Sequence, residues 1–312
     1  MLGKFKFGLG VYTPFGSTVD WEKGWGGRYT LTHLELKAIF IQPTVSYKIN
    51  SKLGIGAGFC YVNGSVNLQK DIPVFSSSDV SQSNPASVEL NGKASGYGAN
   101  FGVYFKPTSK LSLGLTYRTQ VNMKVKEGDV TFTIPPGTNP VISSNFPNQK
   151  FSSTLPLPQV LTLGTAFKAT DKLDIALDIN YVGWKAYDTL AFDYSNNTAG
   201  LKDTKSPRSY SNTFAFRLGG QYKITEAFTA RIGGGYALTP VKEGYVTPET
   251  PDANRVYGTL GLGYTIKQKF SVNASLYYAS FKRENTTNTE TNLSGTYKTT
   301  VIAPGIALSY KF

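Results

Sequence analysis

The stretch TDKLDIALDINY, residues 170–181, carries the pattern that decides the fold. A polar turn at residues 170–172 leads into strict alternation. One set of residues is apolar: Leu173, Ile175, Leu177, Ile179 and Tyr181. The residues between them are small, polar or charged: Asp174, Ala176, Asp178 and Asn180. Successive side chains of a β-strand point to opposite faces, so this segment predicts a strand with one apolar and one polar face.

The same unit recurs along the chain. It begins again at Asn50, Thr108, Thr225 and Lys267, and the chain ends in the same alternation, VIAPGIALSYKF, at residues 301–312. An aromatic residue followed directly by lysine precedes most of the turns, as in Tyr47-Lys48 and Tyr222-Lys223. The spacing is too irregular for a solenoid, so the unit is a repeated hairpin.

Composition agrees with an all-β protein. The 312 residues include 32 Gly, 20 Tyr and 19 Phe, and we find no run of about 18 apolar residues that would predict a membrane helix. The net charge of +12 is spread over strands and turns, which argues against nucleic-acid binding. A single cysteine, Cys60, excludes an intrachain disulfide, and a single histidine, His33, in a loop-like stretch argues against a histidine metal site or a catalytic triad.

A soluble β-sandwich also alternates, but three features favour an antiparallel transmembrane β-barrel. Tight turns alternate with long polar loops, as in outer-membrane barrels. The apolar stripes are eight residue steps long, which at about 3.3 Å per residue and a tilt of about 40° spans roughly 20 Å of membrane. Charged residues on the inward face suit a wet lumen better than a dry core. We predict one barrel domain over residues 1–312, with about twelve to thirteen strands. The segments 293–299 and 300–312 are either two strands or one.

Three motifs resemble the FadL/TodX family of outer-membrane transporters of long-chain fatty acids and other hydrophobic compounds. They are WEKGWGGRY at residues 21–29, the hairpin from Leu155 to Leu190, and TPETPDANRVYGTLGLGYTI at residues 247–266. The resemblance implies a fourteen-stranded barrel with an N-terminal hatch. The signal peptide, hatch and first strand of that pattern are not in this sequence, so we expect an incomplete N-terminus. The terminal Phe312 resembles the signal read by the barrel-assembly machinery.

The resemblance also implies location and function. We expect a monomer in the outer membrane of a Gram-negative bacterium, surrounded by outer-membrane lipid, without enzymatic activity, cofactor or metal. It would capture hydrophobic small molecules, foremost long-chain fatty acids, at its extracellular loops, pass them into the lumen and release them sideways. A non-selective porin and a related barrel that serves protein secretion remain as alternatives.

Candidate site residues follow from this expectation. Loop aromatics could receive ligand, although loop packing explains them equally well: Trp21, Trp25 and Tyr29. Large inward residues could line a pocket: Phe40, Trp184 and Tyr257. Arginines could bind a carboxylate, with salt bridges to Asp174 and Asp178 as the alternative: Arg118, Arg217 and Arg231. Pro43 interrupts a strand and marks either a lateral gate or a simple bulge.

Overall fold

Alternation along the chain produces sixteen strand segments of one antiparallel sheet in the computed structural model, which describes residues 3–311. The strands are β1 (Phe5–Asp20), β2 (His33–Lys48), β3 (Leu53–Ile72), β4 (Ala86–Phe105), β5 (Leu111–Arg118), β6 (Val121–Thr133), β7 (Gln149–Leu157), β8 (Val160–Lys168), β9 (Leu173–Val182), β10 (Thr189–Tyr194), β11 (Thr204–Pro207), β12 (Thr213–Lys223), β13 (Phe228–Ala237), β14 (Arg255–Ile266), β15 (Phe270–Thr287) and β16 (Ser294–Tyr310). Two short helical turns, α1 (Pro140–Ser143) and η1 (Trp184–Ala186), lie in the connections.

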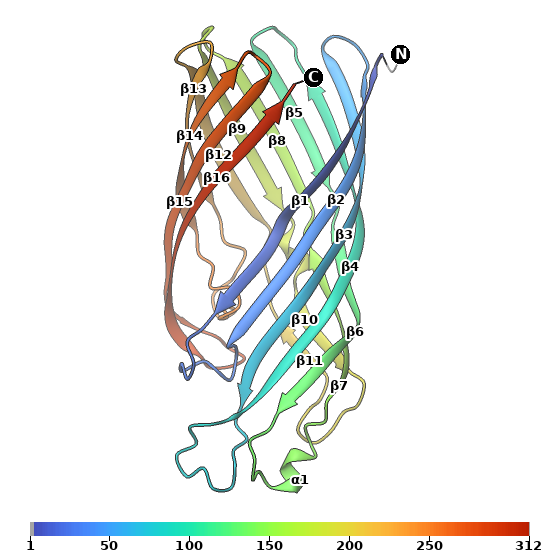
Figure 1. Cartoon of the computed structure of the whole chain (residues 1–312), viewed down its shortest axis with the longest axis vertical. Coiled ribbons are helices and arrows are strands. Elements are labelled where there is room, and N and C mark those ends of the chain that lie inside the picture. The colour runs from blue at the N-terminus through green and yellow to red at the C-terminus, as the bar shows by residue number, and fades with distance from the viewer. Residues whose placement is uncertain (1–2, 312) are drawn as a thin grey trace.

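Twelve of these strands reach the end of the barrel where the tight turns lie: β1 to β5, β8, β9 and β12 to β16. The other four, β6, β7, β10 and β11, extend the sheet toward the long loops (Figure 1). Strands β5 and β6 run one after the other along β4, and β8 and β7 pair with them in turn. The predicted all-β barrel is confirmed, and residues 294–310 form one strand, which settles the number at twelve.

Strand ends differ from the prediction on the long-loop side. The segment predicted to end at residue 12 continues to Asp20, and His33, predicted to lie in a loop, begins β2. These residues pair with each other across β1 and β2, beyond the apolar stripe. Backbone pairing continues there because Leu34 is buried on the inward face with Val19 packed against the same cluster, while outward side chains such as Asp20 meet water. The apolar pattern therefore underestimates strand length.

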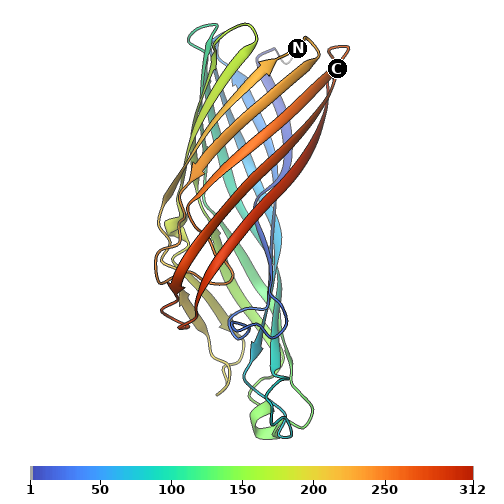
Figure 2. The same cartoon turned by 90° about the vertical axis from the view of Figure 1, so that its left-hand side faces the viewer.

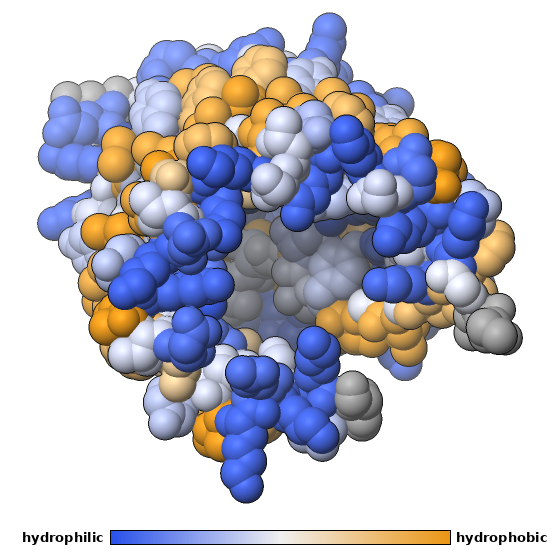
Figure 3. All heavy atoms as spheres, turned by 90° about the horizontal axis from the view of Figure 1, so that it is seen from above, coloured by the Kyte–Doolittle hydropathy of each residue, from blue (hydrophilic) through white to orange (hydrophobic). Residues whose placement is uncertain are grey.

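The sheet curls into a tall barrel with its apolar side chains turned outward (Figures 1 and 2). Leu9, Ile232 and Ile306 are 71%, 67% and 81% exposed, which would cost stability in water but suits contact with lipid. Seen from the tight-turn end, the barrel is hollow, and hydrophilic residues surround the opening (Figure 3). The alternation read from the sequence therefore separates a lipid face from a lumen.

Strands β1 and β16 are the two edges of the sheet. Among the described residues, β1 pairs only with β2, and β16 pairs only with β15. The two edge strands run in opposite directions, because β1 starts and β16 ends at the tight-turn end (Figure 1). The curled sheet thus has a seam along which no backbone pairing joins the two edges in residues 3–311.

The long-loop half of the barrel is packed inside. Three buried clusters lie there, one around Leu31, Leu90 and Phe151, another around Phe40 and Val62, and a third around Tyr210 and Val246. Close packing requires glycine at Gly128 in β6, where a Cβ atom would lie 2.2 Å from the ring of Phe151. This glycine adjoins the bulge at which the register of β6 against β7 shifts.

We predict that Gly128→Ala destabilises the barrel while Gly114→Ala in β5 leaves it nearly unchanged. The added methyl group at residue 128 must displace the buried ring of Phe151, and overpacking of this kind costs about 1–3 kcal/mol. A Cβ at Gly114 meets nothing within 4 Å. Urea unfolding in vesicles, followed by β-sheet circular dichroism, measures both. Equal midpoints for the two variants would contradict the packing described here.

Candidate functional site

The lumen contains a cavity of about 1060 Å³. One side is apolar and is formed by β1, β2, β3, β4, β6 and β7: Phe15, Leu34, Leu36, Ala38, Val66, Leu68, Ala94, Met123, Val125, Leu155 and Leu157. The opposite side carries aromatic and polar groups from the later strands and loops: Trp184, Tyr187, Tyr210, Arg217, Arg255, Tyr257 and Tyr277. An apolar wall with a few convergent polar groups is the usual make-up of a small-molecule site.

A bulge in β1 turns Phe15 into this cavity. The register of β1 against β2 shifts by one residue between Tyr12 and Phe15, at the position of Pro14. Proline has no N–H to donate to the ladder, so a bulge is where a strand tolerates it. The ring of Phe15 then contacts Trp184 at 5.9 Å and Phe40 at 6.2 Å between centroids.

Arg118 ends β5 and lies over these aromatic rings. Its guanidinium carbon is 5.2 Å from the centroid of Phe15 and 5.4 Å from that of Phe40. The strand ends directly after Arg118. There the amide of Thr119 donates to the carbonyl of Ala99, and the hydroxyl of Thr119 accepts from the amide of Ala99. The buried Nε of Arg118 has no hydrogen-bond partner. A cation that faces an apolar cavity with a donor unused is suited to bind an anion.

Arg217 is held differently from Arg118. Its Nε donates to the hydroxyl of Tyr257 at 3.1 Å, and the side-chain oxygen of Asn180 accepts from both terminal nitrogens, at 2.9 and 3.1 Å, in the amide orientation that also satisfies Thr162. The rings of Tyr257 and Tyr277 lie next to each other in a tilted arrangement, with 5.0 Å between their centroids. Tyr257 also lies over Gly235, where a Cβ would come within 2.4 Å of the phenol. Arg217 is therefore a satisfied, structural part of the cavity wall.

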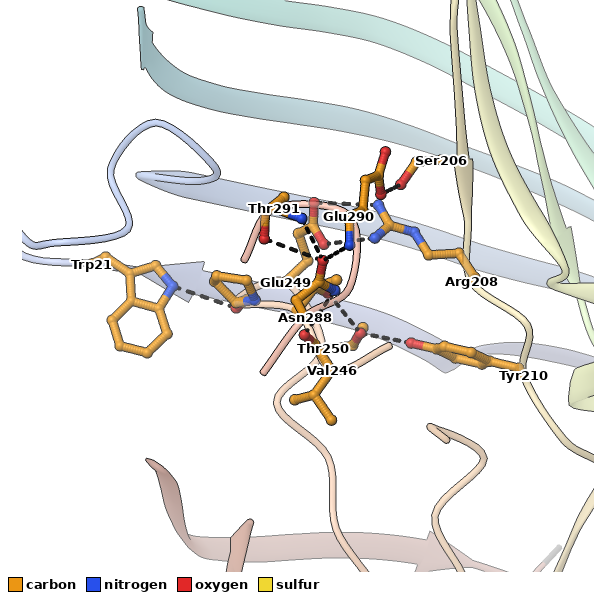
Figure 4. A network of polar contacts seen from close by, with 12 residues as sticks. Trp21, Ser206, Arg208, Tyr210, Val246, Glu249, Thr250, Asn288, Glu290 and Thr291 are labelled. Atoms are coloured by element: carbon orange, nitrogen blue, oxygen red, sulfur yellow. Dashed lines mark hydrogen bonds and ion pairs between the residues drawn. The ribbon is translucent and has the colours of Figure 1, made fainter. Parts of the chain in front are cut away.

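The loop between β13 and β14, residues 238–254, folds inward over the cavity, and we call it the inner loop. Val246, Thr247 and Ala253 are buried, and Glu249 and Thr250 line the cavity. Three other loops hold it in place through contacts that Figure 4 shows. The indole of Trp21 donates to the carbonyl of Pro248 at 3.3 Å, Tyr210 bonds to Thr250 at 2.6 Å, and Asn288 donates to the carbonyl of Val246 at 3.1 Å.

A buried ion pair completes this arrangement. Arg208 and Glu249 approach each other with two N–O distances of 3.3 Å, and their side chains are only 6% and 13% exposed. Burial lowers the pKa of Arg208, but the Glu249 carboxylate together with Tyr187 and Tyr210 more than offsets this effect, so the pKa stands above its usual value and the group remains charged. Burial raises the pKa of Tyr210, which keeps that phenol protonated. Near neutral pH, Arg208 is thus charged and Tyr210 is neutral where they hold the inner loop.

The structure brings four of the predicted residues to the cavity: Arg118, Trp184, Arg217 and Tyr257. Phe40 is fully buried behind it, in contact with Phe15. The loop aromatics lie outside the cavity lining. Trp21 stacks on Trp25 at 4.4 Å, and Arg28 covers Tyr29. Arg231 also lies outside, where it donates to Gln221 and Asn273 at 2.8 Å.

Pro43 is exposed on the lipid side of β2, opposite Leu9 of β1. The ladder to β3 omits two residue pairs at this point, between Ile41–Tyr61 and Thr44–Gly58, but keeps its register. Pro43 therefore weakens the wall without forming a bulge, and its role as a gate stays a prediction. Phe312, predicted to contact the assembly machinery, lies outside the described residues.

Sequence reasoning missed Phe15, Arg208 and Glu249. The proline in TPFG could have indicated the bulge at Phe15, by the same rule that we applied to Pro43. The pair of Arg208 and Glu249 joins two loops, and its residues are 41 positions apart, so no local sequence pattern predicts it.

Other kinds of site find little support in residues 3–311. No helix there is long and apolar enough to cross a membrane. Within the same range, no group of three or more His, Cys, Asp and Glu side chains could hold a metal ion. Cys60 is buried and free.

A curled antiparallel sheet with an apolar exterior and a partly apolar cavity in its lumen defines the class of membrane β-barrels. The family model described as outer membrane protein transport protein (OMPP1/FadL/TodX) matches residues 3–312, and the chain belongs to this family. The predicted family is therefore confirmed, as are the location in the outer membrane of a Gram-negative bacterium and the absence of enzymatic activity. The description of the family model is that of a transport protein of the outer membrane.

Individual relatives are distant. A long-chain fatty acid transport protein of Escherichia coli is 22% identical over 299 residues, covering 88% of this chain and 66% of the relative. Outer membrane protein P1 of Haemophilus influenzae is 23% identical over 303 residues, covering 90% of this chain and 64% of the relative. The chain thus spans about two thirds of the length of these relatives.

Solved structures confirm the fold. A Pseudomonas aeruginosa FadL homologue matches with a TM-score of 0.79 at 21% identity, over 98% of this chain and 75% of that one. The toluene transporter TodX of Pseudomonas putida matches with a TM-score of 0.69 at 19% identity, over 100% of this chain and 80% of that one.

We predict that Arg208→Met loosens the inner loop. The substitution leaves the Glu249 carboxylate buried without its partner, which costs about 3–5 kcal/mol in comparable cases. Hydrogen exchange at residues 241–248 should speed up by about a hundredfold or more. The double variant Arg208→Met/Glu249→Met should recover most of the protection, because no lone charge is left.

Arg283→Met is the matched control for this experiment. Arg283 pairs with Glu243 of the same loop at 3.1 Å, but that carboxylate is 76% exposed. Exposed ion pairs contribute at most about 1 kcal/mol, so exchange in this variant should rise only a few-fold. If both single variants speed exchange equally, the buried pair is not what closes the loop.

Proposed function

We propose that this protein transports long-chain fatty acids, with the lumen cavity as the site that holds them. The observation that supports this ligand best is the pairing of a large apolar cavity with Arg118. The volume of about 1060 Å³ lies at the upper end of the range for small-molecule sites, which suits a long ligand. An apolar wall packs against an alkyl chain, and a guanidinium with an unused donor can donate a hydrogen bond to a carboxylate.

Among the predicted arginines, Arg118 fits the carboxylate-binding role best. Arg217 already donates to Tyr257 and Asn180, and Arg231 already donates to Gln221 and Asn273. Rebinding those donors to a ligand would break existing hydrogen bonds. A hydrogen bond from Nε of Arg118 breaks none, and the rings of Phe15 and Phe40 cover part of the guanidinium and reduce its contact with water. Exclusion of water strengthens a charge-assisted hydrogen bond.

The route has three steps in this proposal. Ligand enters from the long loops after the inner loop moves aside, since that loop covers the cavity. It then rests with its carboxylate at Arg118. It leaves sideways through the wall made by β1, β2 and β3, where Pro14 lies at the bulge in β1 and the ladder between β2 and β3 is interrupted at Pro43. The stacked Trp21 and Trp25 remain candidates for the first contact, and we propose that the protein acts as a monomer.

We predict that Arg118→Gln weakens binding of palmitate to the purified barrel by about tenfold or more. A hydrogen bond to a charged group contributes about 1.5–3 kcal/mol. Binding of hexadecanol, which has the same chain and no charge, should change little. Isothermal titration in detergent measures both ligands. Arg231→Gln outside the cavity is the control and should bind palmitate as the parent does. Equal loss of palmitate and hexadecanol would mean that Arg118 supports the cavity rather than the carboxylate.

Transport itself is tested in liposomes that contain the barrel. We expect saturable uptake of labelled palmitate with little ion conductance in the same preparation. Conductance without saturable uptake would replace the proposal with a general pore. A folded barrel with neither signal would favour the related barrels that serve protein secretion.

A further inference from the structure

Lysines gather at the tight-turn end of the barrel, and the strand register sets ten of them in five neighbouring pairs. In each pair the backbone N–H of one lysine donates to the carbonyl of the other at 2.7–2.9 Å, so the two residues lie side by side on adjacent strands. The pairs are Lys48 with Lys4, Lys106 with Lys52, Lys168 with Lys110, Lys223 with Lys172, and Lys311 with Lys269. All of these side chains are exposed except that of Lys168, which is half-buried.

The charge of this rim is one-sided. With Lys6 and Lys267, the turns and strand ends on this side carry twelve lysines against three carboxylates, those of Asp171, Asp174 and Glu226, a net charge of +9 out of the chain's +12. Like charges directly opposite each other across strands are destabilising. Only Lys168 has a carboxylate partner among the described ion pairs, Asp171 at 2.7 Å. A rim built this way is more stable with anions bound than without.

The height of the rim in the membrane indicates which anions are available to the lysines. Five of the lysines directly follow an aromatic residue on the lipid side of its strand: Tyr47, Phe105, Phe167, Tyr222 and Tyr310. Aromatic side chains of membrane proteins concentrate at the level of the lipid headgroups. Each of these lysines lies one residue, about 3.3 Å, further along its strand than the aromatic residue. The lysines therefore lie at or just beyond the level of the lipid headgroups.

We propose that these lysine pairs bind the phosphate groups of anionic phospholipids in the periplasmic leaflet of the outer membrane. The tight turns of outer-membrane barrels face the periplasm, which assigns the leaflet. Alternation directs the Cα–Cβ bond of a lysine that follows a lipid-facing aromatic residue toward the lumen side of its strand end. The long flexible stem, free of the strand's packing, lets the ammonium turn outward to a headgroup. Two ammonium groups side by side neutralise one phosphate more fully than either alone.

An acidic protein that docks on the opening is the other partner that a basic rim could accept (Figure 3). Lipid is favoured because it always surrounds the barrel at this height, and because the aromatic neighbours place the lysines in the headgroup layer. The proposal does not depend on which hydrophobic compound the lumen carries.

Native mass spectrometry of the purified protein tests the proposal. The barrel in detergent is offered equal amounts of phosphatidylglycerol and phosphatidylethanolamine of the same acyl chains, and the retained lipids are counted. We expect several-fold preference for phosphatidylglycerol, decreasing with added salt as screening grows. The rim variant changes one lysine of each pair to glutamine, and should lose most of this preference. Its substitutions are Lys48→Gln, Lys106→Gln, Lys110→Gln, Lys223→Gln and Lys269→Gln.

A matched control loses the same charge from the other end of the barrel. Its five substitutions are at exposed lysines: Lys23→Gln, Lys126→Gln, Lys202→Gln, Lys205→Gln and Lys242→Gln. This variant should keep the parent's preference. Equal retention of the two lipids by the parent overturns the proposal, as does equal loss of preference in the two variants. A twelve-residue oligoglutamate peptide serves as a competitor. If micromolar peptide removes the preference from the parent but does not bind the rim variant, the rim is a protein-docking surface instead.

Discussion

A lipid bilayer offers no hydrogen-bond partner to a peptide group, and the architecture of this protein follows from that constraint. Each strand inside the sheet satisfies its backbone through two neighbours, so twelve strands curl together rather than stand alone. The pleat then forces successive side chains to opposite sides. Apolar residues on one side meet lipid, and everything that the protein does with a ligand has to be built from the other side.

Arginine is found in the lumen and near the long loops but not at the tight-turn rim, whereas lysine is found at both ends of the barrel. Arginines lie in the lumen and near the loops, where planar guanidinium groups stack on aromatic rings or share several acceptors, as Arg118 and Arg217 do. The tight-turn rim carries lysine alone among basic residues. A compact ammonium on a flexible stem suits a mobile partner, whereas a guanidinium suits a fixed geometry. The distribution of the two residues therefore separates a fixed binding cavity from an adaptable rim.

The sequence alone predicted features with a local cause. Alternation and turn residues indicated the barrel, about twelve to thirteen strands, and the inward position of Arg118, Trp184, Arg217 and Tyr257. Features that depend on distant segments were not accessible. The inner loop and the pair of Arg208 and Glu249 require three-dimensional contacts between loops. The lysine pairs were visible as single residues spread along the chain, and only the register of neighbouring strands shows that they are adjacent.

The direction of the two edge strands limits how the seam between β1 and β16 can close. The two edges run antiparallel to each other, so they are able to pair directly or through any even number of intervening strands. One hairpin would bring the total to fourteen, the number that the family resemblance implies. A single additional strand, as the resemblance first suggested, would have to lie parallel to one of its two neighbours. Strand parity thus makes a hairpin, rather than one strand, the smallest insert that keeps the whole barrel antiparallel.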